Sequence, residues 1–280
     1  FSRRLEYGTE ILNPVPKEIR QNGAVLHLTG KEKIFYAAGS SEAKRMAEKV
    51  RDDLSGYLQI QLTLEESAGL KPECLVVGLS PETSSAAKVS DKSGAYTLEV
   101  RENAIVLNGR DHAGVFYAAV TLSQLERYAL LKNEATLKGT VISDWPELPH
   151  RIWRSWSDAR NSVYTQRTKG VDTPEETLAV HYDYLTRLAI GSKMNFFSLQ
   201  NPTAIRHENP ETKIFTHRNA FITLPQLREL ADYCRRHYVE FTPSLNGPAH
   251  AHWLTDKFPD LIMPGYNSYD ADPTRPEFFK

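Results

Sequence analysis

The sequence is poor in cysteine, because Cys74 and Cys234 are its only thiols and they lie far apart along the chain. Metal sites built on cysteine use short, repeated spacings, and neither residue has a second ligand at such a spacing. We therefore expect both thiols to be small buried hydrophobic side chains. Two isolated cysteines leave the redox state of the compartment open.

The sequence also lacks an excess of charge of one sign, since 34 lysines and arginines stand against 35 aspartates and glutamates. A formal net charge of −1 produces no field that would attract nucleic acid or an anionic membrane, so neither partner is expected. No run of apolar residues approaches the length of about 18 that a membrane-spanning helix needs. The apolar share of 40% and the charged share of 25% are ordinary for a globular protein, and we expect small or neutral ligands.

Signals for export and for nucleotide binding are missing as well. The chain begins at Phe1 without a methionine or an apolar signal core, and we therefore expect a mature or trimmed chain. The glycines of Gly109-Arg110-Asp111-His112-Ala113-Gly114 do not have the spacing of a phosphate-binding loop, which argues against a nucleotide site.

The first half of the chain, up to about Val141, mixes short strand patterns with two helical patterns. One helix can begin at Ser40 or Ser41, because either serine is a good N-cap and the apolar residues that follow recur with helical period. The other predicted elements are strands at 34–38 and 74–77, a hairpin of 95–100 with 104–107, and a long buried helix at 111–131. Strands and helices mixed in this way predict a small α+β sandwich with its helices on one face.

The second half, from about Asp144, alternates strands and helices in a regular order. Two capping boxes, Thr173 to Glu176 and Thr223 to Gln226, predict helix starts, and apolar residues of helical period follow each. The predicted strands are residues 151–156, 193–199 and 239–245. Repeats of this kind imply right-handed parallel crossovers, as in a β/α barrel or a doubly wound sheet. A (β/α)8 barrel needs about 250 residues, so we expect a longer parent chain or a partner that supplies the other strands.

Several segments follow one another in an order and spacing that are typical of one enzyme family. They are Leu12-Asn13-Pro14-Val15-Pro16, Gly94 to Val100, Ala113-Gly114-Val115-Phe116-Tyr117, Ile142-Ser143-Asp144-Trp145-Pro146, Lys193-Met194-Asn195 and Pro243 to Ala251. Together they resemble the β-N-acetylhexosaminidases of glycoside hydrolase family 20 over nearly the whole chain. The resemblance implies an N-terminal α/β accessory domain at residues 1–142, and the first three β/α units of a TIM-type (β/α)8 barrel at residues 143–280.

The resemblance also implies a function for the complete protein. Family 20 enzymes hydrolyse N-acetylhexosamine-containing glycans with retention, through attack of the substrate's own acetamido oxygen on the anomeric carbon. That mechanism needs a carbohydrate substrate and no cofactor. Enzymes of this kind are commonly exported, so the resemblance implies an extracytoplasmic location, periplasmic or secreted. Whether the protein forms a homo-oligomer stays open.

The acids of that mechanism are expected outside this chain. In the family, an adjacent Asp-Glu pair after the fourth barrel strand orients the acetamido group and protonates the leaving oxygen, and the 280 residues stop before it. We therefore predict no catalytic residue in this chain and no activity of the fragment alone. Ser244, Asn246 and Ala249 replace the glutamate, aspartate and glycine of the family's strand-three motif, and Gln200-Asn201 stand where the family has acids. These departures indicate a divergent specificity.

Four residues are candidates for binding the sugar, because barrels hold ligands at the carboxyl ends of their strands. They are Arg151, Asn246, His250 and Trp253. Arg151 offers five fixed donors to sugar hydroxyls, and Asn246 can donate to a hydroxyl as well. His250 matches the family's histidine that supports the general acid, and Trp253 can stack on a sugar face. The competing interpretations are a surface arginine, a turn asparagine, a loop histidine and a buried tryptophan.

Two other functions stay open from the sequence. The replaced acids are also expected of a non-catalytic carbohydrate-binding protein that has kept the scaffold and lost catalysis. The segment His250-Ala251-His252 could ligate zinc in a metal-dependent hydrolase, although no further ligands stand at a recognisable spacing.

Overall fold

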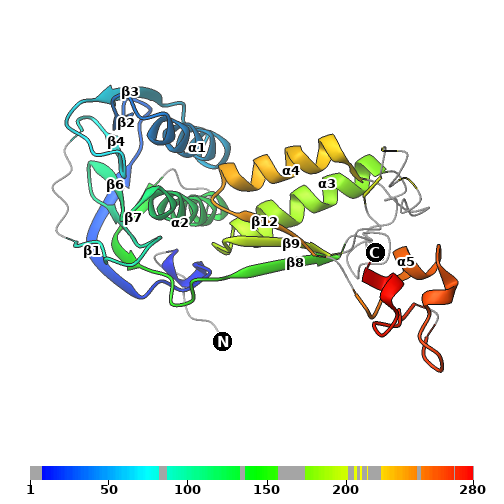
Figure 1. Ribbon diagram of the computed structural model, residues 1–280. Coiled ribbons are helices and arrows are strands. Elements are labelled where there is room, and N and C mark those ends of the chain that lie inside the picture. Colours follow the sequence, from blue (N-terminus) through cyan, green and yellow to red (C-terminus); the bar gives the residue numbers. More distant parts are fainter. Residues whose placement is uncertain are drawn as a thin grey trace. The chain divides into compact units, whose positions relative to one another are not determined.

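The computed structural model describes residues 8–81, 87–132, 136–156, 174–200, 205–206, 209, 213, 222–244, 247–267 and 269–279. The chain divides into two compact units, Phe1–Pro149 and His150–Lys280 (Figure 1). Among the helices of the described residues, none combines the length with the hydropathy that a membrane crossing requires.

The first unit is built on a seven-stranded sheet with the strand order β1-β7-β5-β6-β4-β2-β3. Its elements are the 3-10 turn η1 (Thr9–Ile11) and the strands β1 (Glu18–His27), β2 (Lys33–Ala37), β3 (Thr63–Ser67), β4 (Cys74–Gly78), β5 (Tyr96–Val100), β6 (Ala104–Gly109) and β7 (Thr136–Asp144). Neighbouring strands are antiparallel except for β2 and β3, which run parallel and are joined through helix α1 (Ser41–Leu58). The predicted hairpin is β5–β6, with Leu98 opposite Leu107.

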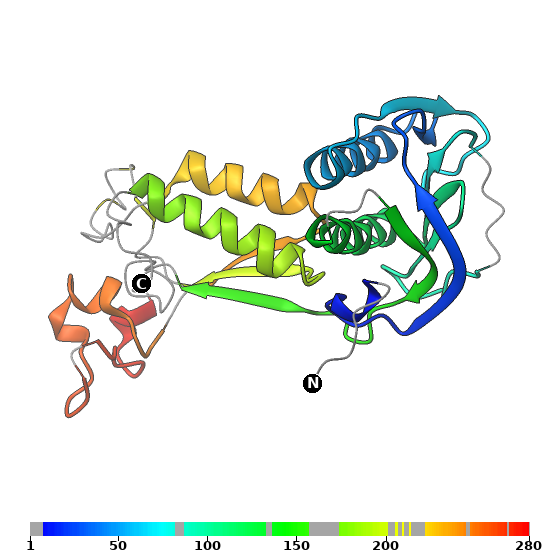
Figure 2. The same ribbon diagram turned by 180° about the vertical axis from the view of Figure 1, so that it is seen from behind.

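Helices α1 and α2 (His112–Leu131) cover the same face of this sheet, as Figure 1 and Figure 2 show from opposite sides. Helix α1 packs on β2, β3 and β4, whereas α2 packs on β5, β6 and β7. Ser40 caps α1 by accepting a hydrogen bond from Ala43 N at 3.1 Å, and Asp111 caps α2 by accepting one from Gly114 N at 2.8 Å. The predicted α+β sandwich with helices on one face is confirmed.

The core of the first unit lies between the two helices and the sheet. All five residues of β4 are buried, and so is the apolar stripe of α1, which includes Met46, Val50 and Leu54. Burial raises the pKa of the Cys74 thiol to about 12, although the charge of Lys71 opposes the rise. Cys74 is therefore an unreactive hydrophobic side chain, as predicted.

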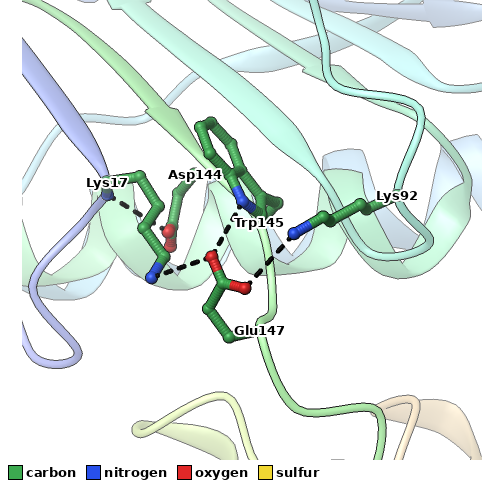
Figure 3. A network of polar contacts seen from close by, with 5 residues as sticks. All are labelled: Lys17, Lys92, Asp144, Trp145 and Glu147. Atoms are coloured by element: carbon green, nitrogen blue, oxygen red, sulfur yellow. Dashed lines mark hydrogen bonds and ion pairs between the residues drawn. The ribbon is translucent and has the colours of Figure 1, made fainter.

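The segment that follows β7 is fixed to the first unit through Glu147 (Figure 3). Its carboxylate accepts from Lys17 Nζ at 3.2 Å, from Lys92 Nζ at 3.3 Å and from Trp145 Nε1 at 3.2 Å. The hydrogen bonds and charges of the two lysines lower the pKa of Glu147. Asp144, the last residue of β7, accepts from Lys17 N at 3.3 Å. These contacts join the residue before β1, the loop before β5 and the chain that leaves β7.

The second unit contains a three-stranded parallel sheet in the order β12-β9-β8. Its strands are β8 (Ile152–Trp156), β9 (Phe196–Gln200) and β12 (Glu240–Ser244), and its longer helices are α3 (Pro174–Tyr184), which continues as the π-helical turn η2 (Leu185–Ile190), and α4 (Leu224–Arg236). The shorter elements are the parallel pair β10 (Ile205–Arg206) and β11 (Ile222–Thr223), the helix α5 (His252–Thr255), and the 3-10 turns η5 (Pro259–Leu261) and η6 (Pro276–Phe279).

Strand order and helix placement in this half agree with both of the folds that the sequence leaves open. Strands β8, β9 and β12 are neighbours in the order in which the chain visits them, and α3 and α4 lie on one face of the sheet in both views (Figure 1 and Figure 2). A β/α barrel has this arrangement, and so does one half of a doubly wound sheet, whose strand order reverses only beyond the third strand.

The capping box predicted at Thr223 is present at the start of α4. Gln226 N donates to Thr223 Oγ1 at 3.4 Å, and Thr223 N donates to Gln226 Oε1 at 3.0 Å. Thr173 of the other predicted capping box lies outside the described residues. On α4, Cys234 is buried, and burial raises the pKa of its thiol to about 12, so this cysteine also matches the prediction.

Candidate functional site

The carboxyl ends of β8, β9 and β12 lie side by side, because the three strands are parallel and in register. Trp156, Gln200 and Ser244 are the last residues of the strands and occupy equivalent positions. Ligands of β/α barrels contact the loops at this end, whereas the amino ends contribute to stability. The candidate site is therefore this end of the sheet, together with the chain that follows Ser244.

Ser244 ends β12 with a buried hydroxyl that has no hydrogen-bond partner among the described residues. A buried hydroxyl without a hydrogen-bond partner costs about 1–3 kcal/mol of stability. Binding of a ligand group that hydrogen-bonds to this hydroxyl would recover that free energy. At the carboxyl end of the strand, a polar group of a ligand can supply that partner. The sequence shows Ser244 only as a departure from the family motif, and its burial is what adds it to the candidate site.

His250 lies in the loop after β12, and its exposed side chain lies beside Tyr269. The imidazole and phenol rings stack with 5.1 Å between their centroids and an angle of 9° between their planes. His250 N donates to Asp270 Oδ1 at 3.3 Å, and the N–H of the next residue, Ala251, donates to Tyr269 O at 2.7 Å. The loop that carries His250 is thus tied to residues 269–271.

A small apolar cluster fixes the chain around this loop. Its buried members are Ala251, Leu254, Leu261 and Ala271, and Phe278 packs against them. The backbone of this cluster is also hydrogen-bonded to the loop, because Ala271 N donates to Pro248 O at 2.9 Å. Since packed apolar side chains permit little movement, the backbone on either side of His250 has one defined arrangement.

Two carboxylates in the segment after α5 accept hydrogen bonds from residues of the same turn. Asp270 Oδ2 accepts from Asn267 Nδ2 at 3.4 Å, and Asp272 Oδ1 accepts from Thr274 Oγ1 at 2.6 Å. The hydrogen bonds from the Thr274 side chain and backbone lower the pKa of Asp272, which is therefore a charged acceptor at neutral pH. In the part of the chain that the structure describes, no three His, Cys, Asp or Glu side chains are grouped as ligands of a metal ion.

Arg151 lies at the opposite end of the sheet from His250, immediately before β8. Its Nε donates to Lys193 O at 2.9 Å, and its backbone N donates to Asn195 Oδ1 at 2.8 Å. Its carbonyl accepts from Asn195 N at 3.0 Å and from Phe196 N at 3.1 Å. The structure thus does not bring Arg151 and His250 together, and these contacts tie the start of β8 to the turn before β9.

The remaining candidates fall in parts of the chain of which less is described. Asn246 lies outside the described residues, so its role in sugar binding stays a prediction. Trp253 and His252 belong to α5, and their side chains lie outside the described part. The stacking role of Trp253 and the zinc pair of His250 with His252 therefore stay predictions as well.

Comparison with known proteins gives one family and a set of similar folds. Residues 9–145 match the family model of glycosyl hydrolase family 20, domain 2. The exo-β-N-acetylglucosaminidase from Vibrio harveyi, solved in complex with N-acetylglucosamine, is 15% identical with a TM-score of 0.67 over 100% of this chain and 44% of that chain. The N-acetyl-β-hexosaminidase from Streptomyces plicatus is 17% identical, with a TM-score of 0.65 over 94% of this chain and 50% of its own. The chitobiase from Flavobacterium johnsoniae is 18% identical, with a TM-score of 0.64 over 96% and 41%.

These comparisons establish the fold class. Comparison with curated protein sequences finds no match. The chain spans about half or less of the length of the three solved relatives. At such low sequence identity, the similarity shows a shared fold and nothing further. An α+β sandwich followed by a partial (β/α)8 barrel, the fold predicted from the sequence, is confirmed. Residues 9–145 thus match a domain of glycosyl hydrolase family 20, and the fold of the chain is similar to that of the solved β-N-acetylhexosaminidases of that family.

Proposed function

We propose that the full-length protein containing this chain is a glycoside hydrolase that acts on N-acetylhexosamine-containing glycans. The observation that carries the proposal is His250, which follows the third parallel strand at the end where barrels bind ligands. The segment that holds it, Pro243 to Ala251, resembles the family's strand-three motif. The structure of the Vibrio harveyi enzyme in complex with N-acetylglucosamine supports this class of sugar.

The proposed reaction is retaining and assisted by the substrate. The acetamido oxygen forms a bond to the anomeric carbon while the bond from that carbon to the leaving oxygen breaks, and a carboxylic acid gives the leaving oxygen its proton. Water then opens the oxazoline-type intermediate. The acid pair belongs to a part of the protein outside these 280 residues, and His250 supports the acid through a hydrogen bond.

The sugar is proposed to bind to side chains at the carboxyl end of the sheet. Ser244, whose buried hydroxyl has no partner among the described residues, can bond to a sugar hydroxyl, and Asn246 and Trp253 stay candidates for further contacts. Arg151 remains a weaker candidate, because its contacts at the amino end of β8 suit a structural role.

The test is hydrolysis of an aryl β-N-acetylglucosaminide by the full-length protein, with the matching aryl β-glucoside as the control substrate. Because the acetamido group is the proposed nucleophile, aryl release is expected from the first compound and none above background from the second. Proton NMR should show the β anomer as the first product. Equal rates on both compounds would contradict acetamido participation, and the α anomer would contradict retention.

A carbohydrate-binding protein without turnover is the second candidate function. The observation that favours it is the pair of acid replacements at Ser244 and Asn246. Titration calorimetry of the full-length protein with N-acetylglucosamine separates the two functions. Binding without release of the aryl group from any N-acetylhexosaminide would support the binding function.

Organisation and location complete the proposal. We assign residues 1–142 to the accessory domain and residues 143–280 to the barrel portion; this boundary falls within β7, and the compact units divide after Pro149. We also propose an extracytoplasmic location, periplasmic or secreted, because enzymes that this chain resembles are commonly exported. Cell fractionation tests it. Light scattering of the purified protein would show whether it forms a homo-oligomer.

A further inference from the structure

His250 has an unusual backbone conformation, with a φ of 54° in the left-handed region. Among the described residues, three other non-glycine residues share this region, namely Gln59, Lys193 and Tyr238, and each lies in the turn that ends a helix. Helices commonly end in this conformation, which accounts for those three. His250 instead precedes a helix, so its conformation has to be imposed by the residues around it.

The groups that impose it are Tyr269 and Asp270. The Asp270 carboxylate accepts the backbone N–H of His250, and the Tyr269 ring stacks in parallel on the imidazole. The carbonyl of Tyr269 accepts the N–H of Ala251 on the other side of the histidine. His250 is thus held at its backbone, at its ring and at the following peptide.

Tyr269 and Asp270 are themselves anchored independently of His250. Asp270 O accepts from Met263 N at 2.8 Å, and Asp270 N donates to Asn267 O at 3.0 Å. The next residue, Ala271, is fully buried and forms a β-bridge with Ile262. Because these contacts exist without the histidine, the segment 269–271 can set the position of His250.

We propose that Tyr269 and Asp270 are positioning residues that fix the His250 imidazole at the carboxyl end of β12. For catalysis this inference rests on the proposed function, since a fixed imidazole is useful when it supports the general acid. Its geometric part is independent of that function, because the stacked ring and the accepted N–H define one orientation of His250. A misplacement of about 1 Å of a supporting group can reduce a rate by about 100-fold.

The test uses two matched pairs of variants of the full-length protein. Tyr269→Phe keeps the stacked ring and Tyr269→Leu removes it, whereas Asp270→Asn keeps an oxygen acceptor for the His250 N–H and Asp270→Ala removes it. We expect kcat on an aryl β-N-acetylglucosaminide to fall by about 10- to 100-fold in Tyr269→Leu and Asp270→Ala, with a much smaller change in KM. The Phe and Asn variants should keep kcat within about threefold, which a general loss of stability would not explain.

A second readout does not depend on activity. Carbethoxylation of His250 by diethyl pyrocarbonate, followed by peptide mass spectrometry, reports access to the imidazole. Removal of the stacked ring should raise the rate at His250 several-fold, while Tyr269→Phe should leave it unchanged. If the parent protein cleaves no N-acetylhexosaminide, the proposed function fails, and this readout still decides the positioning role. Unchanged reactivity of His250 in both Tyr269→Leu and Asp270→Ala would overturn the inference. If one of these two variants does not fold, the pair of variants at the other position decides.

Discussion

The two units differ in how completely they bury their strands. In the first unit, all five residues of β4 are buried, and only Lys33 of the neighbouring β2 is exposed. In the second unit, the central strand β9 buries Phe197 and Leu199, whereas the edge strand β12 has the same exposed and half-buried pattern as the edge strand β3 of the first unit. Ile152 in the other edge strand, β8, is 58% exposed. Burial of apolar surface is the main favourable term in folding. The first unit therefore contains its own hydrophobic core, whereas the described residues of the second unit bury less apolar surface.

The largest test of this contrast is a pair of truncations, one in each sheet. Leu107→Ala in β6 removes a fully buried side chain and is expected to lower the free energy of unfolding by about 2–5 kcal/mol. Ile152→Ala in β8 should change it by less than about 0.5 kcal/mol in the 280-residue chain. Urea titration of each variant measures both values. Equal losses would remove the contrast between the units.

Glu126 on α2 is the exception within the well-packed first unit. Its side chain is fully buried, and neither carboxylate oxygen has a hydrogen-bond partner among the described residues. Burial raises the pKa of Glu126 well above its usual range, and the charge of Asp53 adds to the rise while Lys49 opposes it. At a pH between the ordinary glutamate pKa and the raised pKa of Glu126, this carboxyl group is therefore protonated in the folded state and ionised in the unfolded state.

The stability of the first unit should therefore fall as the pH rises from about 4.3, the ordinary glutamate value, towards the raised pKa of Glu126 in the folded state. Glu126→Gln removes this titration and should stabilise the protein by about 1–3 kcal/mol at pH 7, with little effect at pH 4. Thermal unfolding across this pH range measures the difference. The exposed Glu102→Gln is the control, and a gain of the same size there would contradict the role of burial.

Each unit has a helix whose N-terminus is capped by a side-chain hydroxyl, so removal of the same kind of hydrogen bond can be compared between the two units. Ser40→Ala removes the cap of α1, and Thr223→Ala removes the hydroxyl of the capping box of α4. Each change should cost about 1 kcal/mol, because each leaves one helix N–H without its acceptor. Urea titration followed by circular dichroism checks both. A much larger loss for Thr223→Ala would show that the second unit depends more on local helix stability.

The smallest expected effect belongs to Glu147, whose carboxylate is exposed. Because Lys17 and Lys92 lower its pKa in the folded state, its contribution is present at neutral pH and is lost as the pH falls through that lowered value. Glu147→Gln should produce a slight increase in amide hydrogen exchange at Trp145, residue 147 and Leu148 at low salt, and high salt should abolish the difference. An effect that persists in high salt would point to lost packing in place of lost charge.

Most helices and the strands β2, β4, β5 and β6 follow from the sequence, whereas β1, β3 and β7 of the same sheet do not. Strand β1 has no clear signature in the sequence, since it contains Asn22-Gly23, a pair typical of turns. In the structure this pair forms an irregularity opposite β7, where a side chain on Gly139 would come within 2.0 Å of Asn22 Oδ1. An edge strand with such a bulge has little hydrophobic alternation to reveal it.

The candidate site was predictable only in part, because contacts between segments that lie far apart in the sequence appear only in the fold. His250 was found through the motif around it, and it does lie after the carboxyl end of β12. The sequence places Arg151 near the first barrel strand, but its guanidinium donates to the carbonyl of Lys193, before β9. Tyr269 and Asp270 were missed, because their segment has no periodicity and meets His250 only through the fold.

The two cysteines give each unit its own internal reporter. Cys74 lies in the sheet of the first unit and Cys234 on α4 of the second, and both thiols are buried with a pKa of about 12. A thiol in this state reacts only after its surroundings have opened. Alkylation in native buffer, read peptide by peptide, would therefore measure how often each half opens without altering a single residue.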